Sequence, residues 1–499
     1  MNYNIKNIGF KSSIYITLII FSLGHSLFAQ AKSEKINSLM KYCNINLQFN
    51  GNILVAEHGK IIYHHSFGIA NFDPVGSLNL GSQFRLGSVS KQFTAMAIMI
   101  LEERGKLNYD DDINIYLPEF PYKKITIRHL LTHTSGLPDY ISLFDQYWDT
   151  EKKDDSDKKI ADNEDVLTML CKYHKDPLFN PGEKWQYCNT GYVILALIVN
   201  RVSGEPFEKF LYDNIFKPLN MTNTLVYSAI RNDSITNRVY GYSLAMNGVD
   251  YIPNDFHYLN GVAGDGGVYS TTGDLFKWDQ ALYTEKLVSR QTLKKAFTPV
   301  ALNNGTTFNY GFGWSIDTSL TGKKCVRHGG SWVGFRTYIL REIQDNNTII
   351  LLTNNTSNYV DDIINKLASI LHSKIFKYPK VSIDYIVGKT LVTQGIDSAI
   401  SLYHFLKNKE FDKYNFAEKK LNSLGYRLIS LNKLPEAIAV LKLNVESFPK
   451  SFNTYDSLGE AYMLYGNTDL AIKNYEKVLE LNPENTNALE KLKQLQKED

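Results

Sequence analysis

A serine followed three residues later by a lysine is the first feature of this sequence that could do chemistry. A serine hydroxyl becomes an effective nucleophile only when a base removes its proton and hydrogen-bond donors stabilise the oxyanion that forms. In the pattern Ser-x-x-Lys the lysine lies one helical turn after the serine and can take part in the proton transfer. The pattern alone is weak, because it occurs five times, at Ser38, Ser88, Ser156, Ser430 and Ser447.

Ser88 is the occurrence whose surroundings fit a buried active site. It precedes the run Val89–Leu101, which is apolar on nearly every face and predicts a helix buried at the centre of a domain and ended by Gly105. Ser88 would lie at the N-terminus of this helix, where free N–H groups and the helix dipole favour developing negative charge, with Lys91 on the same face. The alternative is that Ser88 only caps the helix and that Lys91 reaches to water.

Strand patterns at both ends of the first 380 residues predict one antiparallel sheet built from distant segments. Residues 52–58 and 61–70 flank Gly59-Lys60 and predict a hairpin. Further strands are predicted at Tyr310–Ile316, Cys325–His328, Phe335–Arg341 and Thr348–Thr353, followed by an amphipathic helix at Asp361–Phe376. Helical patterns dominate between the two groups of strands. The expected fold is therefore α/β (α+β), a sheet flanked by terminal helices with an inserted helical domain, and a cleft between such layers is a usual place for a site.

The last 120 residues repeat themselves. Pairs that lie 34 residues apart are Leu424-Gly425 and Leu458-Gly459, Ala437-Ile438 and Ala471-Ile472, Leu441 and Tyr475, and Pro449 and Pro483. This period resembles the tetratricopeptide repeat, with residues 383–412 as a degenerate first unit. About three units are enough to bury a continuous core, so residues 383–499 are expected to form an all-α repeat extension that could bind a protein partner. An unrelated helical bundle is the alternative.

The N-terminus follows the pattern of a secretory signal peptide. Lys6 and Lys11 precede the apolar run Ile14–Leu23, and cleavage is plausible after Ala29 or Ala31. The run is shorter than the roughly 20 residues that span a bilayer. We therefore expect residues 1–29 to be removed and the protein to be periplasmic or secreted, without a stable membrane anchor. Without the two leader lysines the basic and acidic residues balance, which makes nucleic acid an unlikely partner by default.

Metal and cofactor sites are not indicated. The four cysteines, Cys43, Cys171, Cys188 and Cys325, form no C-x-x-C pair and are expected to be buried thiols. His129 and His133 are four residues apart, but no H-E-x-x-H pattern accompanies them, so structural roles are expected. We predict no cofactor and no metal.

Several longer segments carry a family resemblance. Phe84–Ala95 resembles the active-site serine segment of the serine β-lactamase-like superfamily, in the branch of class C β-lactamases, D-alanyl-D-alanine carboxypeptidases, D-aminopeptidases and related esterases. Stretches typical of that branch follow in the same order, at Ile125–Pro138, Ile215–Met221 and Gly266–Leu275. The resemblance implies a β-lactamase/transpeptidase-like fold for a serine hydrolase domain at residues 32–377.

The resemblance also implies roles for two further motifs. Tyr187-Cys188-Asn189 matches the Tyr-x-Asn of the family, in which the tyrosine helps to activate the serine and returns the proton to the leaving group. Asn189 would hydrogen-bond Lys91 and the substrate amide. A neighbouring Lys91 ammonium would favour the ionised phenol of Tyr187. The alternative for Tyr187 is an aromatic side chain at the edge of the core.

His328-Gly329-Gly330 stands where many members have Lys-Thr-Gly. The glycines would let substrate backbone lie against the strand edge, and the backbone N–H groups of Ser88 and Ser331 would form the oxyanion hole. Because histidine is only partly charged at pH 7, a permanent cation for a substrate carboxylate is missing here, which lowers the expectation of efficient β-lactamase activity. Arg327 or Arg336 could compensate.

Two functions follow as hypotheses. The first is an extracytoplasmic serine hydrolase that acts through an acyl-enzyme on an amide or ester, such as a D-amino-acid peptide, a short ester or a β-lactam. The second is a penicillin-binding, sensor-like protein with little turnover, whose repeats bind a protein partner.

Overall fold

The computed structural model describes residues 30–72, 74–148, 160–173, 175–231, 234–245, 250–357 and 359–496. The chain divides into two compact units, the first made of residues up to Ser243 with Pro253–Tyr378 and the second of Leu244–Ile252 with Pro379–Asp499. The predicted signal peptide and the Ser-x-x-Lys pattern at Ser156 lie outside the described residues. In the part of the chain that is described, no helix is long and apolar enough to cross a membrane.

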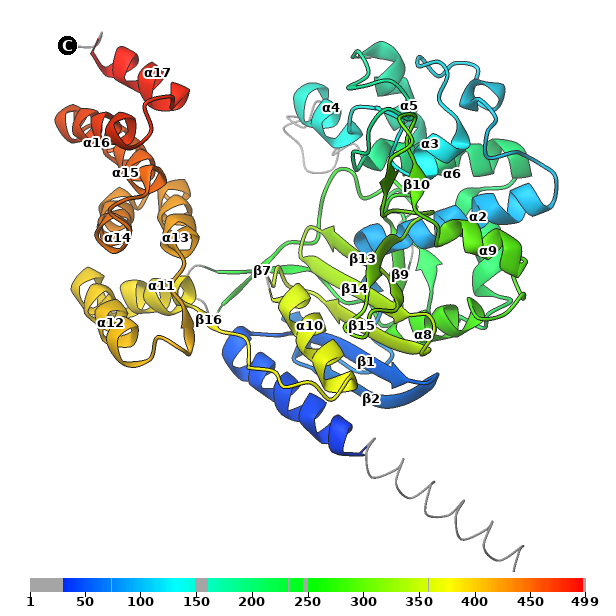
Figure 1. Ribbon diagram of the computed structural model, residues 1–499, viewed down its shortest axis with the longest axis horizontal. Coiled ribbons are helices and arrows are strands. Elements are labelled where there is room, and N and C mark those ends of the chain that lie inside the picture. The colour runs from blue at the N-terminus through cyan, green and yellow to red at the C-terminus, as the bar shows by residue number, and fades with distance from the viewer. Residues whose placement is uncertain are drawn as a thin grey trace, which may run out of the picture. The chain divides into compact units, whose positions relative to one another are not determined.

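The first unit is built on one six-stranded antiparallel sheet (Figure 1). Its strands, in spatial order, are β12 (Ser315–Thr318), β13 (Lys324–Trp332), β14 (Phe335–Glu342), β15 (Asn347–Thr353), β1 (Gly51–Glu57) and β2 (Lys60–Phe67). Gly51 of β1 pairs with Thr353 of β15, so the sheet joins segments about 300 residues apart in the sequence. The prediction of one antiparallel sheet from distant segments, including the hairpin around Gly59-Lys60, is confirmed.

Helices cover both faces of this sheet. On one face lie the helix of residues 30–47 and α10 (Val360–Leu371), and on the other lie α8 (Thr272–Ala281) and α2 (Lys91–Glu103) (Figure 1). Side chains that alternate along β2 contact the two layers in turn: the Tyr63 hydroxyl donates to Asn37 at 3.1 Å, whereas the His64 ring lies 2.8 Å from Thr272 Oγ1. The predicted terminal helices therefore flank the sheet.

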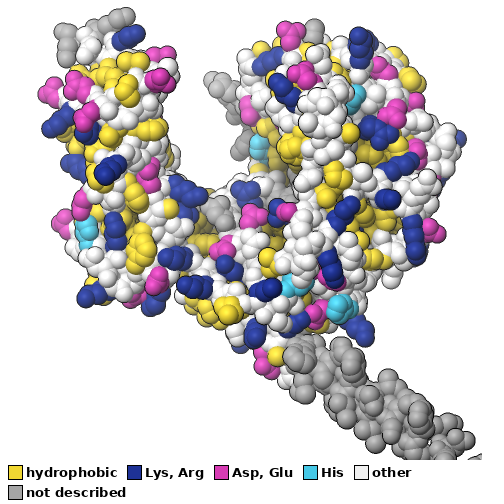
Figure 2. Space-filling view, viewed as in Figure 1, with side chains coloured by type: hydrophobic (Ala, Val, Ile, Leu, Met, Phe, Trp, Pro, Cys, Tyr) yellow, Lys and Arg dark blue, Asp and Glu magenta, His cyan; other side chains and the backbone are white. Residues whose placement is uncertain are grey.

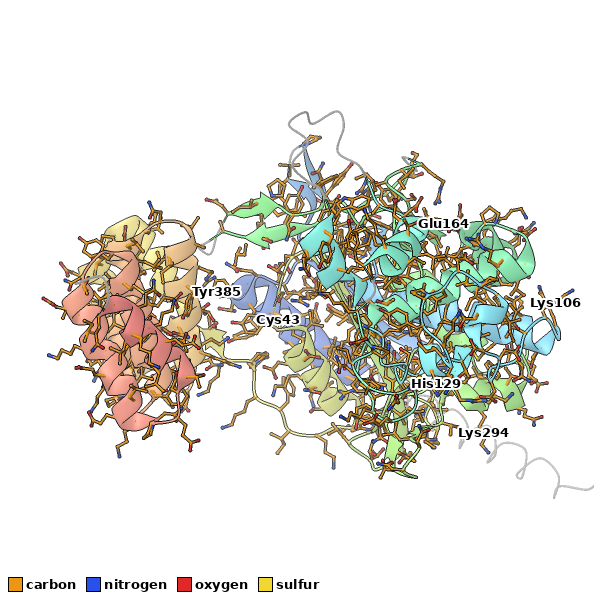
Figure 3. The ribbon with its side chains drawn as sticks, turned by 90° about the horizontal axis from the view of Figure 1, so that it is seen from above. Cys43, Lys106, His129, Glu164, Lys294 and Tyr385 are labelled. Atoms are coloured by element: carbon orange, nitrogen blue, oxygen red, sulfur yellow. The ribbon has the colours of Figure 1, made fainter. Side chains whose placement is uncertain are left out.

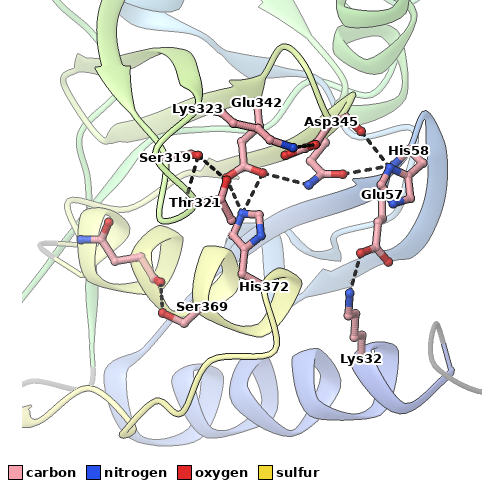
Figure 4. A network of polar contacts seen from close by, with 12 residues as sticks. Lys32, Glu57, His58, Ser319, Thr321, Lys323, Glu342, Asp345, Ser369 and His372 are labelled. Atoms are coloured by element: carbon pink, nitrogen blue, oxygen red, sulfur yellow. Dashed lines mark hydrogen bonds and ion pairs between the residues drawn. The ribbon is translucent and has the colours of Figure 1, made fainter.

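A polar network ties the sheet together at one end (Figure 4). The buried carboxylate of Glu342 lies 2.7 Å from His372 Nε2, which follows α10, and accepts a hydrogen bond from Asn347 Nδ2 at 2.8 Å. The His58 backbone N–H, in the hairpin of β1 and β2, donates to Asn347 Oδ1 at 3.1 Å. These contacts fix the end of the sheet opposite Ser331 and Trp332.

The segment between β2 and β12 is the inserted helical region. Besides α2 and α8 it contains α3 (Ile127–Leu131), α4 (Tyr140–Tyr147), α5 (Asn163–Lys172), α6 (Asn189–Ser203), α7 (Phe207–Leu211), α9 (Arg290–Ala296) and the small strands β5 (Phe84–Arg85), β6 (Leu225–Val226) and β9 (Val268–Ser270). Every residue of α2 from Lys91 to Leu101 is buried, as predicted. A 3₁₀ turn, η1 (Gly87–Ser90), precedes α2, so Ser88 lies just before the α-helix.

Three local predictions need correction. The strand predicted at Tyr310–Ile316 exists only from Ser315 onward, because the chain turns at Gly311 and Gly313 and Gly313 has a φ of +75°. The helix predicted to reach Phe376 ends at Leu371, two residues before Ser373 adopts a φ of +52°. Cys171 is exposed, whereas the other three free thiols are buried as expected.

The second unit contains successive helical pairs. They are α11 (Ile383–Gln394) and α12 (Ile396–Lys409), α13 (Glu418–Ser430) and α14 (Leu434–Ser447), and α15 (Phe452–Leu464) and α16 (Thr468–Leu481), followed by α17 (Thr486–Leu495). The 34-residue period has a packing cause. A Cβ at Gly425 would lie 2.5 Å from the Leu441 side chain, and one at Gly459 would lie 3.3 Å from Tyr475, so each glycine admits its large partner from the next helix. On the face seen in Figure 2, basic and acidic side chains are interspersed on each unit.

Candidate active site

Ser88 and Lys91 are in direct contact. Lys91 Nζ lies 3.1 Å from Ser88 Oγ, and the lysine side chain is fully buried while Ser88 is half-buried. The other two hydrogen bonds of the ammonium go to Asn189 Oδ1 and to the backbone oxygen of Asp265, each at 2.9 Å. Burial of a lysine is costly unless its donors find acceptors, and here three acceptors meet three donors.

Gly87 brings Ser88 against strand β13. It has a φ of +54°, and a Cβ on it would lie 2.7 Å from the backbone nitrogen of Ser331. Gly330 makes a second close approach, since its Cβ would lie 1.9 Å from the backbone oxygen of Leu86. Only glycine allows both approaches, and they place the backbones of Ser88 and Ser331 side by side, as an oxyanion hole requires.

Asn189 has a fixed orientation. Its backbone N–H and its Nδ2 both donate to Asp139 Oδ2, at 2.9 and 3.0 Å. The amide oxygen is thereby left for Lys91. Asp139 is held in turn because its Oδ1 accepts the Ile141 N–H at the N-terminus of α4. The sequence alone did not single out Asp139.

Tyr187 stands over Lys91 in a cluster of aromatic rings. The ammonium lies 5.0 Å from the centre of the Tyr187 ring, within the range of a cation–π contact. The His133 ring is 4.2 Å from that of Tyr187, and burial together with Lys91 and His328 lowers the pKa of His133 well below its usual value. The imidazole beside Tyr187 is therefore neutral.

His328 is buried beside Lys91 and Tyr310. Its side chain is 6% exposed, and burial together with the Lys91 ammonium lowers its pKa to about 4. Its Nε2 lies 2.9 Å from the Tyr310 hydroxyl and its Nδ1 lies 2.7 Å from the Gly329 oxygen. A neutral imidazole with both nitrogens engaged can position its neighbours, and His328 is not among the residues that line the two pockets at Ser88.

Two pockets meet at Ser88. One, of about 110 Å³, is lined by Arg85, Gly87, Ser88, Tyr140, Ile141, Tyr187, Asn189, Leu259, Val262, Asp265, Gly266, Gly267, Ser331 and Trp332. The other is lined by Ser88, Gly329, Gly330, Ser331, Arg336, Thr337, Tyr338, Ser357, Val360 and Asp361. All the predicted site residues except Lys91 and His328 line one of them, and Lys91 lies directly beneath Ser88.

Asp265 is a second acidic residue that the sequence did not single out. It lines the first pocket, and its carboxylate accepts the Tyr140 hydroxyl at 3.1 Å. Burial raises the pKa of its carboxyl above the usual value, although the nearby Lys91 opposes this. The signal nearest to it in the sequence is the stretch Gly266–Leu275, which begins at the next residue.

The structure also places Arg327, Arg336 and His129, the remaining residues that the sequence singled out. Arg327 pairs with Asp317 at 2.6 Å, whereas Arg336 lines the second pocket. His129, labelled in Figure 3, accepts the Thr126 N–H at the start of α3 and so has a structural role. Among the described residues, no group of three His, Cys, Asp or Glu side chains could hold a metal ion.

Comparison with known proteins agrees with this geometry. Residues 49–372 match the family model described as β-lactamase, and residues 457–485 match that of the tetratricopeptide repeat. Penicillin-binding protein 4* of Bacillus subtilis (strain 168) is 40% identical over 361 residues, which are 70% of this chain and 78% of that protein.

Two solved structures share the fold. The octameric penicillin-binding protein homologue from Pyrococcus abyssi has a TM-score of 0.60 at 27% identity, covering 68% of this chain and 77% of that one. The penicillin-binding protein from Bacillus halodurans has a TM-score of 0.58 at 25% identity, covering 67% and 98%. The chain therefore belongs to the β-lactamase family, a family of serine hydrolases and acyltransferases, and carries tetratricopeptide repeats at its C-terminus.

Proposed function

We propose that this protein is a serine hydrolase that acts outside the cytoplasm, through an acyl-enzyme, on an amide or an ester. The observation that carries the proposal is the 3.1 Å contact between Lys91 Nζ and Ser88 Oγ at the floor of a pocket that Tyr187 also lines. A nucleophile held beside a buried cation and a phenol is the arrangement that acyl transfer needs.

The contacts of Lys91 place it where protons must move. Lys91 Nζ is held by Asn189 Oδ1 and the Asp265 backbone oxygen, and it lies 3.1 Å from Ser88 Oγ, a hydroxyl that can donate or accept. Lys91 and Tyr187 are therefore the two groups that we assign to take the proton of Ser88 and to return it. The neutral rings of His133 and His328 add no competing charge.

The reaction has two halves. Ser88 Oγ attacks the acyl carbon while its proton passes to the adjoining pair of Lys91 and Tyr187, and the backbone N–H groups of Ser88 and Ser331 stabilise the oxyanion. Collapse breaks the bond to the leaving group, which takes the proton from Tyr187, and an ester to Ser88 remains. Water then attacks that ester by the same route, releasing the acid and restoring the serine.

The substrate class is proposed as D-amino-acid peptides, short esters or β-lactams. The relatives named above are penicillin-binding proteins, which supports reaction with penicillins. A neutral His328 offers no cation to a β-lactam carboxylate, so we expect penicillin to be hydrolysed slowly. This same feature favours the second candidate function, a penicillin-binding sensor with little turnover whose repeats bind a protein partner.

One experiment tests the nucleophile and separates the two candidates. The protein is incubated with a fluorophosphonate or with penicillin, and intact mass and peptide mapping locate the adduct. We expect a single adduct on Ser88, none on Ser88→Ala, and steady turnover of a short ester. Adduct formation without turnover of peptides or esters would favour the sensor, and failure of the folded protein to form any adduct would contradict both.

The location outside the cytoplasm rests on the leader sequence and has its own test. Residues 1–35 fused to a reporter that is active only after export should give activity, and the same fusion without residues 1–29 should not. Equal activity of the two fusions would contradict this part of the proposal.

A further inference from the structure

Arg85 is a buried cation in the wall of the catalytic pocket. It ends the short strand β5, three residues before Ser88, and it lines the same pocket as Ser88, Tyr187 and Asn189. Arg85 as a whole is only 2% exposed. Nothing in the reaction described above uses it.

The guanidinium has fewer partners than a buried arginine normally finds. Its NH1 group donates to Asn260 Oδ1 at 2.6 Å, and its central carbon lies 5.7 Å from the Trp332 ring. Asn260 Oδ1 is shared, since it also accepts from Trp332 Nε1 at 2.8 Å. The Nε of Arg85 is buried without a hydrogen-bond partner, and among the described residues no carboxylate lies within 4.0 Å of the guanidinium. Buried charges are ordinarily paired, so this one has bonding capacity to spare.

The nearby charges do not fill that capacity. Asp265 lines the pocket too and interacts electrostatically with Arg85, but no hydrogen bond or ion pair within 4.0 Å joins the two, and its carboxylate accepts the Tyr140 hydroxyl. Lys91 already has its three acceptors. An arginine presents a planar fork of donors that matches a carboxylate, and charge-assisted hydrogen bonds of this kind are the strong ones.

We propose that Arg85 binds a carboxylate carried by the acyl part of the substrate. This inference rests on the proposed function and narrows its substrate class to acyl groups that end in an anion. Because two pockets meet at Ser88, we place the leaving group in one of them and the acyl part in the other, which Arg85 and Trp332 line. Leu259 and Val262, in the same pocket, offer apolar surface to the chain between the carbonyl and the carboxylate.

Three matched esters test the proposal. They are the p-nitrophenyl half-ester of adipic acid, its methyl ester at the far carboxyl, and p-nitrophenyl hexanoate, which share a six-carbon acyl chain and differ in its end. For the full-length protein we expect kcat/KM for the anionic ester to exceed that for the methyl-capped ester by about ten- to a hundredfold, the range of a charged hydrogen bond. The capped ester and the hexanoate should be alike, since both lack the charge.

The variant Arg85→Gln should lose this preference. Arg327→Gln is the matched control, because it removes the same charge at an arginine that lines neither pocket and pairs with Asp317. We expect the ratio of anionic to capped ester to fall to about one in Arg85→Gln and to stay unchanged in Arg327→Gln.

A second measurement does not need the Arg85 variant to fold. In the wild-type protein, monomethyl adipate should slow fluorophosphonate labelling of Ser88 at concentrations where dimethyl adipate does not. Equal kcat/KM for the anionic and capped esters, or equal protection by the two adipates, would overturn the role of Arg85 while leaving the hydrolase intact. Absence of both labelling and turnover would overturn the hydrolase and this inference together.

Discussion

His133 holds the chain on both sides of Tyr187. Its backbone oxygen accepts the N–H of Gln186 at 3.0 Å, and its Nδ1 accepts the N–H of Cys188 at 3.2 Å. Its ring also packs on the Tyr187 ring. His133 has a φ of +57°, an uncommon conformation that the surrounding contacts must stabilise. The phenol is thus positioned by one neutral histidine.

Replacing His133 should affect the chemical step more than binding. His133→Ala removes the acceptor for Cys188, and a displaced phenol is expected to slow acylation of Ser88 by about 10- to 100-fold. His133→Asn, whose amide oxygen can take the place of Nδ1, should restore most of the rate. Single-turnover ester cleavage measures this, with KM as the control; a change in KM alone would contradict a positioning role.

Lys91→Met should abolish labelling of Ser88 in a protein that still folds. The unbranched side chain fits the space, but it leaves Asn189 Oδ1 and the Asp265 oxygen without their donor, which costs about 1–3 kcal/mol of stability for each. We expect the rate of fluorophosphonate labelling to fall about 1000-fold or more. Ser88→Ala should lose labelling with almost no change in Tm. Labelling of Lys91→Met within tenfold of wild type would contradict the assignment.

Asp139→Ala should release the Asn189 amide. The variant loses a helix cap, worth about 1 kcal/mol, together with the acceptor that orients Asn189. Asp162→Ala is the matched control, because Asp162 caps α5 in the same way. We expect Tm to fall in both variants, further in Asp139→Ala because two Asn189 donors also lose their acceptor, and acylation to slow about tenfold only in Asp139→Ala, measured by pre-steady-state ester cleavage.

Acid should destabilise the first unit through His328. Its pKa is about 4 when folded and 6.5 in its ordinary state, so the unfolded chain takes up the proton first as pH falls. The stability that the neutral ring contributes is complete above about pH 6.5 and is lost toward pH 4, to a total of about 3 kcal/mol. Urea unfolding between pH 7.5 and 4.5 checks this. His328→Gln should show a smaller loss over that range, and His133 accounts for part of what remains.

Gly87→Ala should close the oxyanion hole. The added methyl would meet the Ser331 nitrogen at 2.7 Å in a conformation that strains any residue with a side chain. Ester turnover is expected to fall by 100-fold or more, the loss seen when an oxyanion donor is removed. Gly273→Ala, in α8 with its nearest contact at 3.8 Å, should be tolerated. Normal turnover by Gly87→Ala would contradict the predicted place of the oxyanion.

The sequence predicted the regular elements well wherever one pattern ran long enough. The apolar run after Ser88 is long enough to predict a buried helix, and the turn residues Gly59-Lys60 between two apolar runs predict a hairpin. The segment 310–314 has the composition of a strand, but it turns because Gly311 packs against the Ala296 oxygen, a contact between residues 15 apart. Such a constraint is invisible in local composition.

The candidate site divides in the same way. Ser88, Lys91, Tyr187 and Asn189 could be found because they stand in recognisable motifs in a fixed order. Asp139, Asp265 and Arg85 could not be found in this way, because the role of each depends on a hydrogen-bond partner far away in the chain. Asp139 contacts Asn189, Asp265 contacts Tyr140, and Arg85 contacts Asn260. His328 was found, but its depth and its bond to Tyr310 depend on packing that no motif encodes.

The pairing of β1 with β15 has a consequence for how the chain is made. Gly51 can pair with Phe67 of β2 early, but it cannot pair with Thr353 of β15 until residue 353 has been synthesised, and contacts this remote in sequence form slowly. During translation Ser88 and helix α2 are therefore made long before strands β13 to β15, which complete the sheet beside them. Nascent chains stopped short of Thr353 would carry every catalytic side chain and still be inert.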